Sequence, residues 1–306
     1  MESGDLATRI RDSVAQMPGS GSNGFVKPST EELSRLRQLV LGAASGDVAD
    51  AVSLIEASGL PLRLVRYTDT GSGSREVLLV EERTPVTKGW GTLVLDPAPL
   101  RDLVVEVPHP WYDIGTEGEG VELFRRLRAR ALFVAGTHRC ASSEATPCDG
   151  SSDVCGSTRY RVSDPAHFTA GPFQAAHEVL SALWPRSVSL SVHGHSDSAC
   201  EDVFLSSGVA GDPGPLVPVL RERLLALGGM SIGAAGIPGS SCSLVASSNV
   251  QGRFSNGSRE PCTVAATAAT GRFVHAEQSR AVRTNPVHVE TFARALEAVV
   301  PSVPLP

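Results

Sequence analysis

The sequence has few aromatic residues, no excess of positive charge and no long apolar run. Aromatic residues make up 5% of the 306 residues, and the formal net charge is −6. Nucleic-acid-binding proteins usually carry clustered Lys and Arg beside stacking aromatic side chains, so this composition argues against a nucleic-acid partner. A membrane-spanning helix needs roughly 18–20 consecutive apolar residues. No run of that length occurs, and we therefore expect no membrane span.

Several short motifs are also missing. No two cysteines have the CxxC spacing of a zinc ribbon. No expected strand is followed by the glycine pattern of a Walker or dinucleotide-binding loop. The stretch from Gly194 to Ser198 lacks the Gly-x-Ser-x-Gly elbow of many serine hydrolases. These absences argue against nucleotide binding through those loops and against serine-based hydrolysis.

Six cysteines are present, in a chain of ordinary globular composition with 41% hydrophobic and 20% charged residues. Cys140, Cys148 and Cys155 lie in one Gly- and Ser-rich stretch, and Cys242 and Cys262 flank another. Cysteines in such segments are typical of disulfide-bonded proteins from oxidising compartments. We expect three bridges, and proximity alone suggests Cys148–Cys155 and Cys242–Cys262.

The disulfide expectation favours a secreted or periplasmic protein. Residues 1–13 carry several charges and lack the apolar core of a signal peptide, so the signal would have been removed from this chain. A cytoplasmic protein with six free thiols is the alternative.

Hydrophobic patterning divides the chain near residue 100. Residues 1–30 are expected to be a loose lead-in, 31–41 a helix, 60–82 a β-hairpin and 89–97 a strand. From residue 101 to 306, short β-branched strands alternate with amphipathic helices. This order predicts an α/β domain of three-layer α/β/α, phosphorylase/hydrolase-like type, with a mixed central sheet and the region 1–100 packed on it. In such sheets the site lies at the carboxyl ends of the strands.

Three expected strands are followed by histidines, namely His109, His138 and His193. Prolines on both sides hold the backbone around His109. Thr116 and Glu119 have capping-box spacing, which predicts a helix start there and places Glu117 in its first turn. Histidine and carboxylate side chains are zinc ligands, so we expect zinc on His109, Glu117 and His193.

Two further residues lie at the same edge. Glu277 ends a late strand and could take a proton from a zinc-activated water, or could instead form an ion pair with Arg280 or Arg283. His195 follows a glycine after His193, and a capping or supporting role is favoured for it.

The order of these residues resembles that of the zinc carboxypeptidases of the funnelin type and of related amidohydrolases. The latter are aspartoacylase, succinylglutamate desuccinylase and, more loosely, N-formylglutamate amidohydrolase. The stretch FVHAEQS (273–279) looks like the strand that bears their catalytic glutamate, and VSLSVHGHS (188–196) looks like their second-histidine strand. The resemblance covers roughly residues 100–300 in order and spacing.

The chain departs from that family in two places. The family uses His-x-x-Glu, whereas the nearest acids after His109 are Asp113 and Glu117, so the second ligand is open between them. The family's Asp-x-Asn-Arg substrate motif is replaced by residues 164–167, which end in Ala166 and His167.

The resemblance implies a zinc-dependent hydrolase of an amide or peptide bond. The substrate would be small and carry a carboxylate, as a peptide or an acylated amino acid does. Glu277 would act as general base and then acid, and Arg139 would face the oxyanion or the carboxylate. Arg253 lies between two cysteines, either at a substrate-facing rim or in a disulfide-clipped loop. The rival is a non-catalytic binding or structural protein that keeps the fold.

Overall fold

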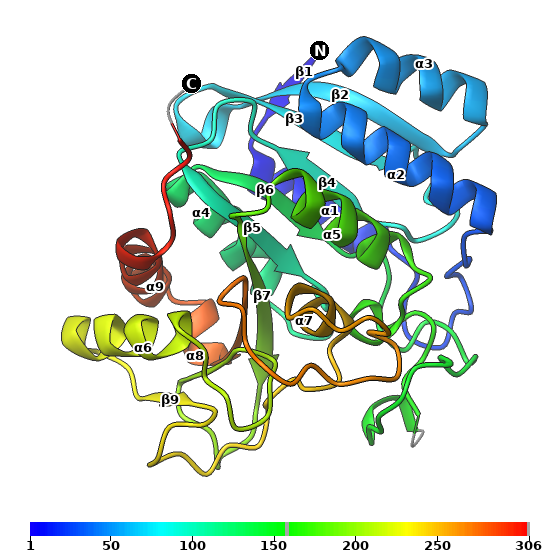
Figure 1. The fold of residues 1–306 in the computed structure, drawn as a ribbon. Helices are drawn as coiled ribbons and strands as arrows, with labels where there is room; N and C mark the ends of the chain where they lie inside the picture. Colours follow the sequence, from blue (N-terminus) through cyan, green and yellow to red (C-terminus); the bar gives the residue numbers. More distant parts are fainter. Residues whose placement is uncertain (157–158, 305–306) are drawn as a thin grey trace.

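A mixed β-sheet runs through the middle of the molecule. The computed structural model describes residues 1–156 and 159–304, and within them the strand order is β1-β2-β3-β4-β6-β5-β7-β10-β8-β9 (Figure 1). Strands β5, β6, β7 and β10 form a parallel centre, while β4 and β8 pair antiparallel with it. The strands are β1 (Glu2–Gly4), β2 (Leu62–Asp69), β3 (Arg75–Glu82), β4 (Thr92–Leu95), β5 (Arg101–Val107), β6 (Ala129–Val134), β7 (Val188–His195), β8 (Val203–Ser206), β9 (Ile232–Ala234) and β10 (Phe273–Ser279).

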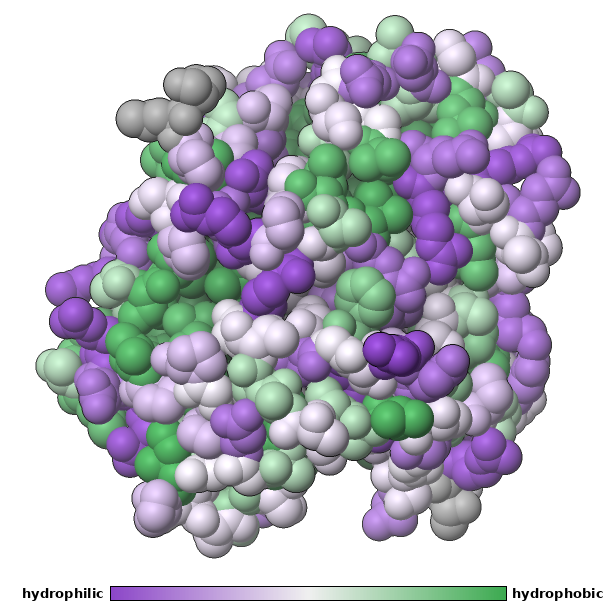
Figure 2. All heavy atoms as spheres, in the orientation of Figure 1, coloured by the Kyte–Doolittle hydropathy of each residue, from purple (hydrophilic) through white to green (hydrophobic). Residues whose placement is uncertain are grey.

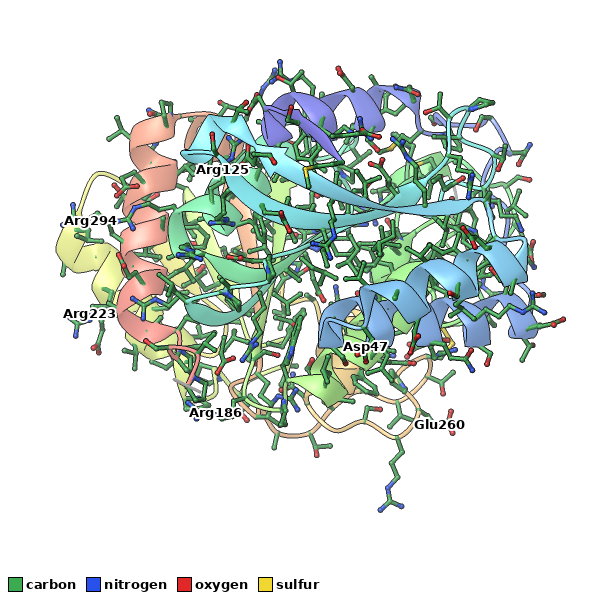
Figure 3. All side chains as sticks on the ribbon, turned by 90° about the horizontal axis from the view of Figure 1, so that it is seen from above. Asp47, Arg125, Arg186, Arg223, Glu260 and Arg294 are labelled. Carbon is green, nitrogen blue, oxygen red and sulfur yellow. A yellow bond between two sulfur atoms is a disulfide. The ribbon has the colours of Figure 1, made fainter. Side chains whose placement is uncertain are left out.

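Helices cover both faces of this sheet, which gives the expected three-layer α/β/α fold. Helices α1, α4, α6 and α9 pack over one hydrophobic core, and α2, α3 and α5 pack over the other. Seen from above, α6 and α9 lie at one end of the molecule and α2 and α3 near the other (Figure 3). The helices are α1 (Leu6–Gln16), α2 (Thr30–Ser45), α3 (Val48–Ser58), α4 (Thr116–Leu127), α5 (Pro172–Leu183), α6 (Leu216–Leu227), α7 (Val250–Ser255), α8 (Arg280–Arg283) and α9 (Pro286–Val299).

Strand β5 shows why the centre of the sheet is apolar on both sides. Leu103, Val105 and Val107 belong to one core, and Val104 to the other. Because successive side chains of a strand point to opposite faces, helices on both sides bury both sets of side chains. The buried acids of this strand, Asp102 and Glu106, are paired with Arg130 and His177. Figure 2 shows hydrophilic and hydrophobic residues interspersed over the face of the molecule that is seen in Figure 1. Within the described residues, no helix is both long and apolar enough to cross a membrane.

The expectation of a loose lead-in over residues 1–30 was wrong. Strand β1 pairs with β2, and α1 buries Leu6, Ile10 and Val14, which recur every four residues along one helix face. Asp5 caps α1 by accepting from the amides of Ala7 and Thr8. The segment is therefore part of the fold.

An arginine ties this segment to the sheet and to α4. Arg125, labelled in Figure 3, donates to Asp5 Oδ1 over 2.6 Å and to Asp69 Oδ1 and Oδ2 over 2.7 and 2.8 Å. The hydrogen bond from Arg125 is the largest cause that holds the pKa of Asp5 below its usual range. Strands β2 and β3 form the expected hairpin and continue the same sheet as β5–β7.

Three disulfides join the segments with little regular structure that follow the central strands. They are Cys140–Cys155, Cys148–Cys262 and Cys200–Cys242. The expected number of bridges is confirmed, but the two expected pairs were wrong. Pairing the cysteines by their distance along the chain gave the wrong partners, because the fold brings loops from different strands to the same end of the sheet.

Candidate metal centre and cavity

Two histidines and an aspartate converge at the carboxyl ends of β5 and β7. His109 follows β5, and the chain then turns so tightly that the amide of Asp113 donates to the His109 carbonyl over 2.8 Å. This turn brings Asp113 Oδ2 to 3.4 Å from His109 Nδ1 and to 3.5 Å from His193 Nδ1. All three side chains are buried.

The donor set fits a divalent metal such as zinc. Ligand atoms of a tetrahedral zinc with bonds of about 2.0–2.1 Å lie about 3.3 Å apart, close to the separations from Asp113 Oδ2 to the two imidazole nitrogens. His109 Nδ1 is buried and has no hydrogen-bond partner among the described residues. His109 Nε2 donates to Asp164 Oδ1 over 2.9 Å, which leaves the lone pair on Nδ1, as a metal-binding imidazole with an outer carboxylate requires.

Burial and the neighbouring charges set the ionisation of this group. Burial raises the pKa of Asp113, but its close contacts with the imidazoles of His109 and His193 outweigh burial and lower that pKa well below its usual range. Burial is also the main cause that lowers the pKa of His193 to about 4. The aspartate is therefore ionised and His193 neutral at pH 7, which are the forms that bind metal.

Glu117, the expected second ligand, lies apart from this group. Its Oε2 accepts from the amide of Gly115 over 2.9 Å at the start of α4. The expected capping box is absent: Gly115 occupies the N-cap with φ 100°, a left-handed conformation that favours glycine, and Glu119 instead accepts from Gln278. The structure brings Asp113, the open alternative, to the two histidines.

His138 and His195, the remaining histidines that the sequence places at this edge, have protein partners. His138 Nδ1 accepts from the amide of Cys140 over 3.0 Å, and the ring lies edge-on to Trp111 and Tyr112. His195 Nε2 donates to the carbonyl of Glu201 over 3.0 Å. Neither belongs to the groups of described residues that could hold a metal ion.

Glu277 lies beside the second histidine. In the β7–β10 pair it is the register partner of His193, and its Oε1 lies 3.0 Å from His275 Nε2. Burial raises the pKa of Glu277, but the hydrogen bond and charge of His275 outweigh it and lower that pKa. Among the described residues, Glu277 forms its ion pair with His275 and not with Arg280 or Arg283. Sequence reasoning missed His275, although a spacing of two along a strand puts it on the same face as Glu277.

A cavity of about 380 Å³ opens at this edge of the sheet. His109, His193, His275 and Glu277 border it, and much of the remaining wall comes from residues 151, 152, 154 and 160 and from residues 243–249. The lining residues are His109, Arg139, Ser151, Ser152, Val154, Tyr160, Ala166, His167, His193, Ser243, Leu244, Val245, Ala246, Ser247, Ser248, Asn249, His275 and Glu277.

The two arginines singled out in the sequence lie in different places. Arg139 borders the cavity, and its Nε and Nη2 donate to Asp164 Oδ2 over 3.0 and 2.6 Å. Arg253 is buried behind the wall, where it donates to the carboxylate of Asp149 and to the carbonyls of Ser247 and Pro261. Arg253 therefore supports a disulfide-clipped loop.

Solved structures with a similar fold include an N-formylglutamate amidohydrolase from Ralstonia eutropha JMP134. That match has 12% identity and a TM-score of 0.38, and covers 69% of this chain and 95% of that one. A succinylglutamate desuccinalase from Vibrio parahaemolyticus matches with 11% identity, a TM-score of 0.39 and coverage of 77% and 66%. A metallo-carboxypeptidase from Pseudomonas aeruginosa matches with 15% identity, a TM-score of 0.38 and coverage of 90% and 69%.

These are the kinds of protein that the sequence resembles. With identities of 11–15% and TM-scores of 0.38–0.39, the similarity does not go beyond a partial likeness in fold. No family model matches the chain, and no curated protein matches it.

Proposed function

We propose that this protein is a zinc-dependent hydrolase that cleaves an amide or peptide bond in a small, carboxylate-bearing substrate. The observation that carries the proposal is the convergence of His109 Nδ1, His193 Nδ1 and Asp113 Oδ2 beside a cavity that also contains Glu277. His109, Asp113 and His193 would hold the ion, with Asp113 in place of Glu117.

The chemistry divides between the ion and the protein. When bound, zinc polarises the scissile carbonyl and makes a water molecule acidic near neutral pH. Glu277 takes the proton of the attacking water and returns it to the leaving nitrogen. His275 binds Oε1 of that carboxylate. Oε2 has no partner among the described residues and is the oxygen that would carry the proton.

Asp164 and Arg139 support this arrangement from the other side. One oxygen of Asp164 orients His109, and the other accepts two hydrogen bonds from Arg139. The remaining nitrogen of Arg139, Nη1, has no hydrogen bond among the described residues, and the residue borders the cavity. We assign Nη1 to the carbonyl oxygen that gains charge, or to a carboxylate of the substrate.

The three disulfides are compatible with a secreted or periplasmic protein. We infer that the proposed hydrolase acts outside the cytoplasm. Thiol titration of the unfolded, unreduced chain checks this placement: no free thiols are expected, and six free thiols would contradict it.

Metal analysis tests the site directly. Protein purified without added zinc should contain about one equivalent, and His193→Ala should lose both the metal and the activity. His195→Ala is the matched control, because this neighbouring histidine binds a backbone carbonyl and should leave the metal content unchanged. A chain that binds no zinc even when zinc is supplied would favour the non-catalytic alternative.

Glu277→Gln separates an enzyme from a metal-binding protein. The amide keeps the shape of the carboxylate but cannot accept the proton, so turnover of a responsive N-acyl amino acid or peptide should fall about 10²–10⁴-fold. Zinc content and thermal stability should stay near those of the parent. Loss of zinc would identify Glu277 as a ligand, and full activity would remove it from the mechanism.

A further inference from the structure

One wall of the cavity is formed by Tyr160, His167, Ser248 and Asn249, which we call the Asn249 wall. The rings of Tyr160 and His167 stack with centroids 3.4 Å apart and an angle of 5° between their planes. Asn249 caps α7, and Gln251 of that helix donates to the carbonyl of Pro165 over 2.9 Å. These contacts hold the wall in one arrangement before any ligand arrives.

His167 offers this wall a hydrogen-bond acceptor. Its Nδ1 lies 3.1 Å from the carbonyl oxygen of Ser248. A carbonyl oxygen only accepts, so Nδ1 carries the hydrogen and Nε2 carries the lone pair. Burial is the largest cause that lowers the pKa of His167 to about 3, so the ring is neutral at pH 7. Nε2 has no hydrogen-bond partner among the described residues.

Asn249 offers the same wall a donor. Its Oδ1 accepts from the amide of Gly252 over 2.8 Å, which identifies the other side-chain atom as the NH₂ group. This Nδ2 is buried and has no partner within residues 1–156 and 159–304. The residue is 1% exposed and borders the cavity. A buried donor without a partner is costly, so a ligand that supplies an acceptor gains from binding there.

We propose that the Asn249 wall is a binding subsite for an uncharged amide group of the substrate. A peptide carbonyl oxygen accepts from Asn249 Nδ2, and the N–H on the same side of the peptide donates to His167 Nε2. A carboxylate has no hydrogen for His167, whereas an amide satisfies both groups. The inference rests on the proposed function for the scissile bond nearby and narrows its substrate class to molecules with a second amide, such as peptides.

The experiment measures binding to chelator-treated protein, so that it does not depend on turnover. The probe is the neutral peptide N-acetyl-dialanine N-methylamide, with Kd measured by NMR titration. Asn249→Asp keeps the oxygen that caps α7 and replaces the donor with a second oxygen, so Kd should rise at least about tenfold. His167→Asn keeps a donor for Ser248 and removes Nε2, and Kd should rise at least about fivefold.

Asn285→Asp is the matched control: Asn285 caps α9 with its Oδ1 but does not border the cavity, so Kd should change by less than about twofold. The inference is overturned if the probe does not bind, or if both Asn249→Asp and His167→Asn bind it as the parent does. If Asn249→Asp does not fold, as judged by its thermal melt, His167→Asn decides. Peptide binding with these losses, in a protein that takes up no zinc, would keep the subsite and reject the proposed function.

Discussion

Residues 1–134 and a second group of segments, which we call the cavity segments, are held together by different means. Residues 1–134 contain no cysteine and consist largely of helices and strands packed on two cores. The cavity segments are residues 135–156, 159–164 and 235–249, which include lining residues of the cavity, and residues 196–202 and 256–272, which disulfides join to them. These segments have little regular structure and contain all six cysteines.

The difference follows from what each region exposes. A packed helix or strand satisfies its own backbone hydrogen bonds and buries apolar surface, which offsets the entropy lost on ordering. The cavity segments present serine, imidazole and amide groups and bury fewer apolar side chains. Disulfides restrict the unfolded chain instead, and Cys148–Cys262 joins residues 114 positions apart.

The largest expected effect is in the packed region. Phe124 on α4 is fully buried, so Phe124→Ala should lower the free energy of unfolding by about 3–5 kcal/mol. Denaturant unfolding with and without a thiol reductant measures this loss, which should be similar in both. Val287→Ala is the control, at a 69% exposed position where almost no loss is expected. If the loss of stability vanished under reduction, the two regions would not be stabilised independently.

The disulfide Cys148–Cys262 is the corresponding test of the cavity segments. Replacing both cysteines with serine should cost about 2–5 kcal/mol. Hydrogen exchange should quicken in residues 135–164 and 256–272, while β2 and β3 keep their protection. Zinc content should be retained, because the proposed ligands lie on β7 and in the turn after β5. Uniform loss of protection across the chain would contradict the comparison.

A smaller effect on stability is expected from Glu119, a buried acid in the packed region. Burial raises the pKa of Glu119 from 4.5 to about 7. The folded state therefore binds the proton of the Glu119 carboxyl more tightly than the unfolded chain does. The protonated carboxyl contributes its full stability below about pH 4.5, and this contribution is lost as the pH rises to about 7. At about 1.4 kcal/mol per pH unit, the loss is about 3 kcal/mol.

Glu119→Gln is neutral at every pH and keeps an oxygen for Gln278. This variant should be more stable than the parent at pH 8, by up to about 3 kcal/mol, and equal to it near pH 4. Urea unfolding across this range provides the measurement. Equal stability of the two proteins at pH 8 would contradict the burial argument.

Sequence patterning predicted the central strands and most helices, because burial of one face leaves apolar residues at every second position of a strand and at nearly every fourth position of a helix. Helix α1 carried such a signal in Leu6, Ile10 and Val14, with Asp5 as its cap, but the surrounding Ser and Gly residues hid it. The short strands β8 and β9 lie beside loops and have too few residues for a clear period.

The site could be predicted only in part. The histidines were identifiable because each ends or follows a strand. The choice between Asp113 and Glu117 depends on a turn of four residues, whose direction residue types do not specify. The partners of the cysteines and the role proposed for Asn249 depend on which loops meet in space, and the sequence order does not contain that information.

Strand β10 lies beside β7 so that Glu277 is opposite His193 and Ala276 is opposite Val192. Adding one residue inside residues 273–277 would turn the carboxylate to the other face of the sheet and bring a neighbouring side chain to the cavity. An extra residue in the 256–271 segment would be absorbed by a longer loop at little cost. Among homologues, insertions and deletions should therefore gather before Arg272 and stop abruptly at Phe273.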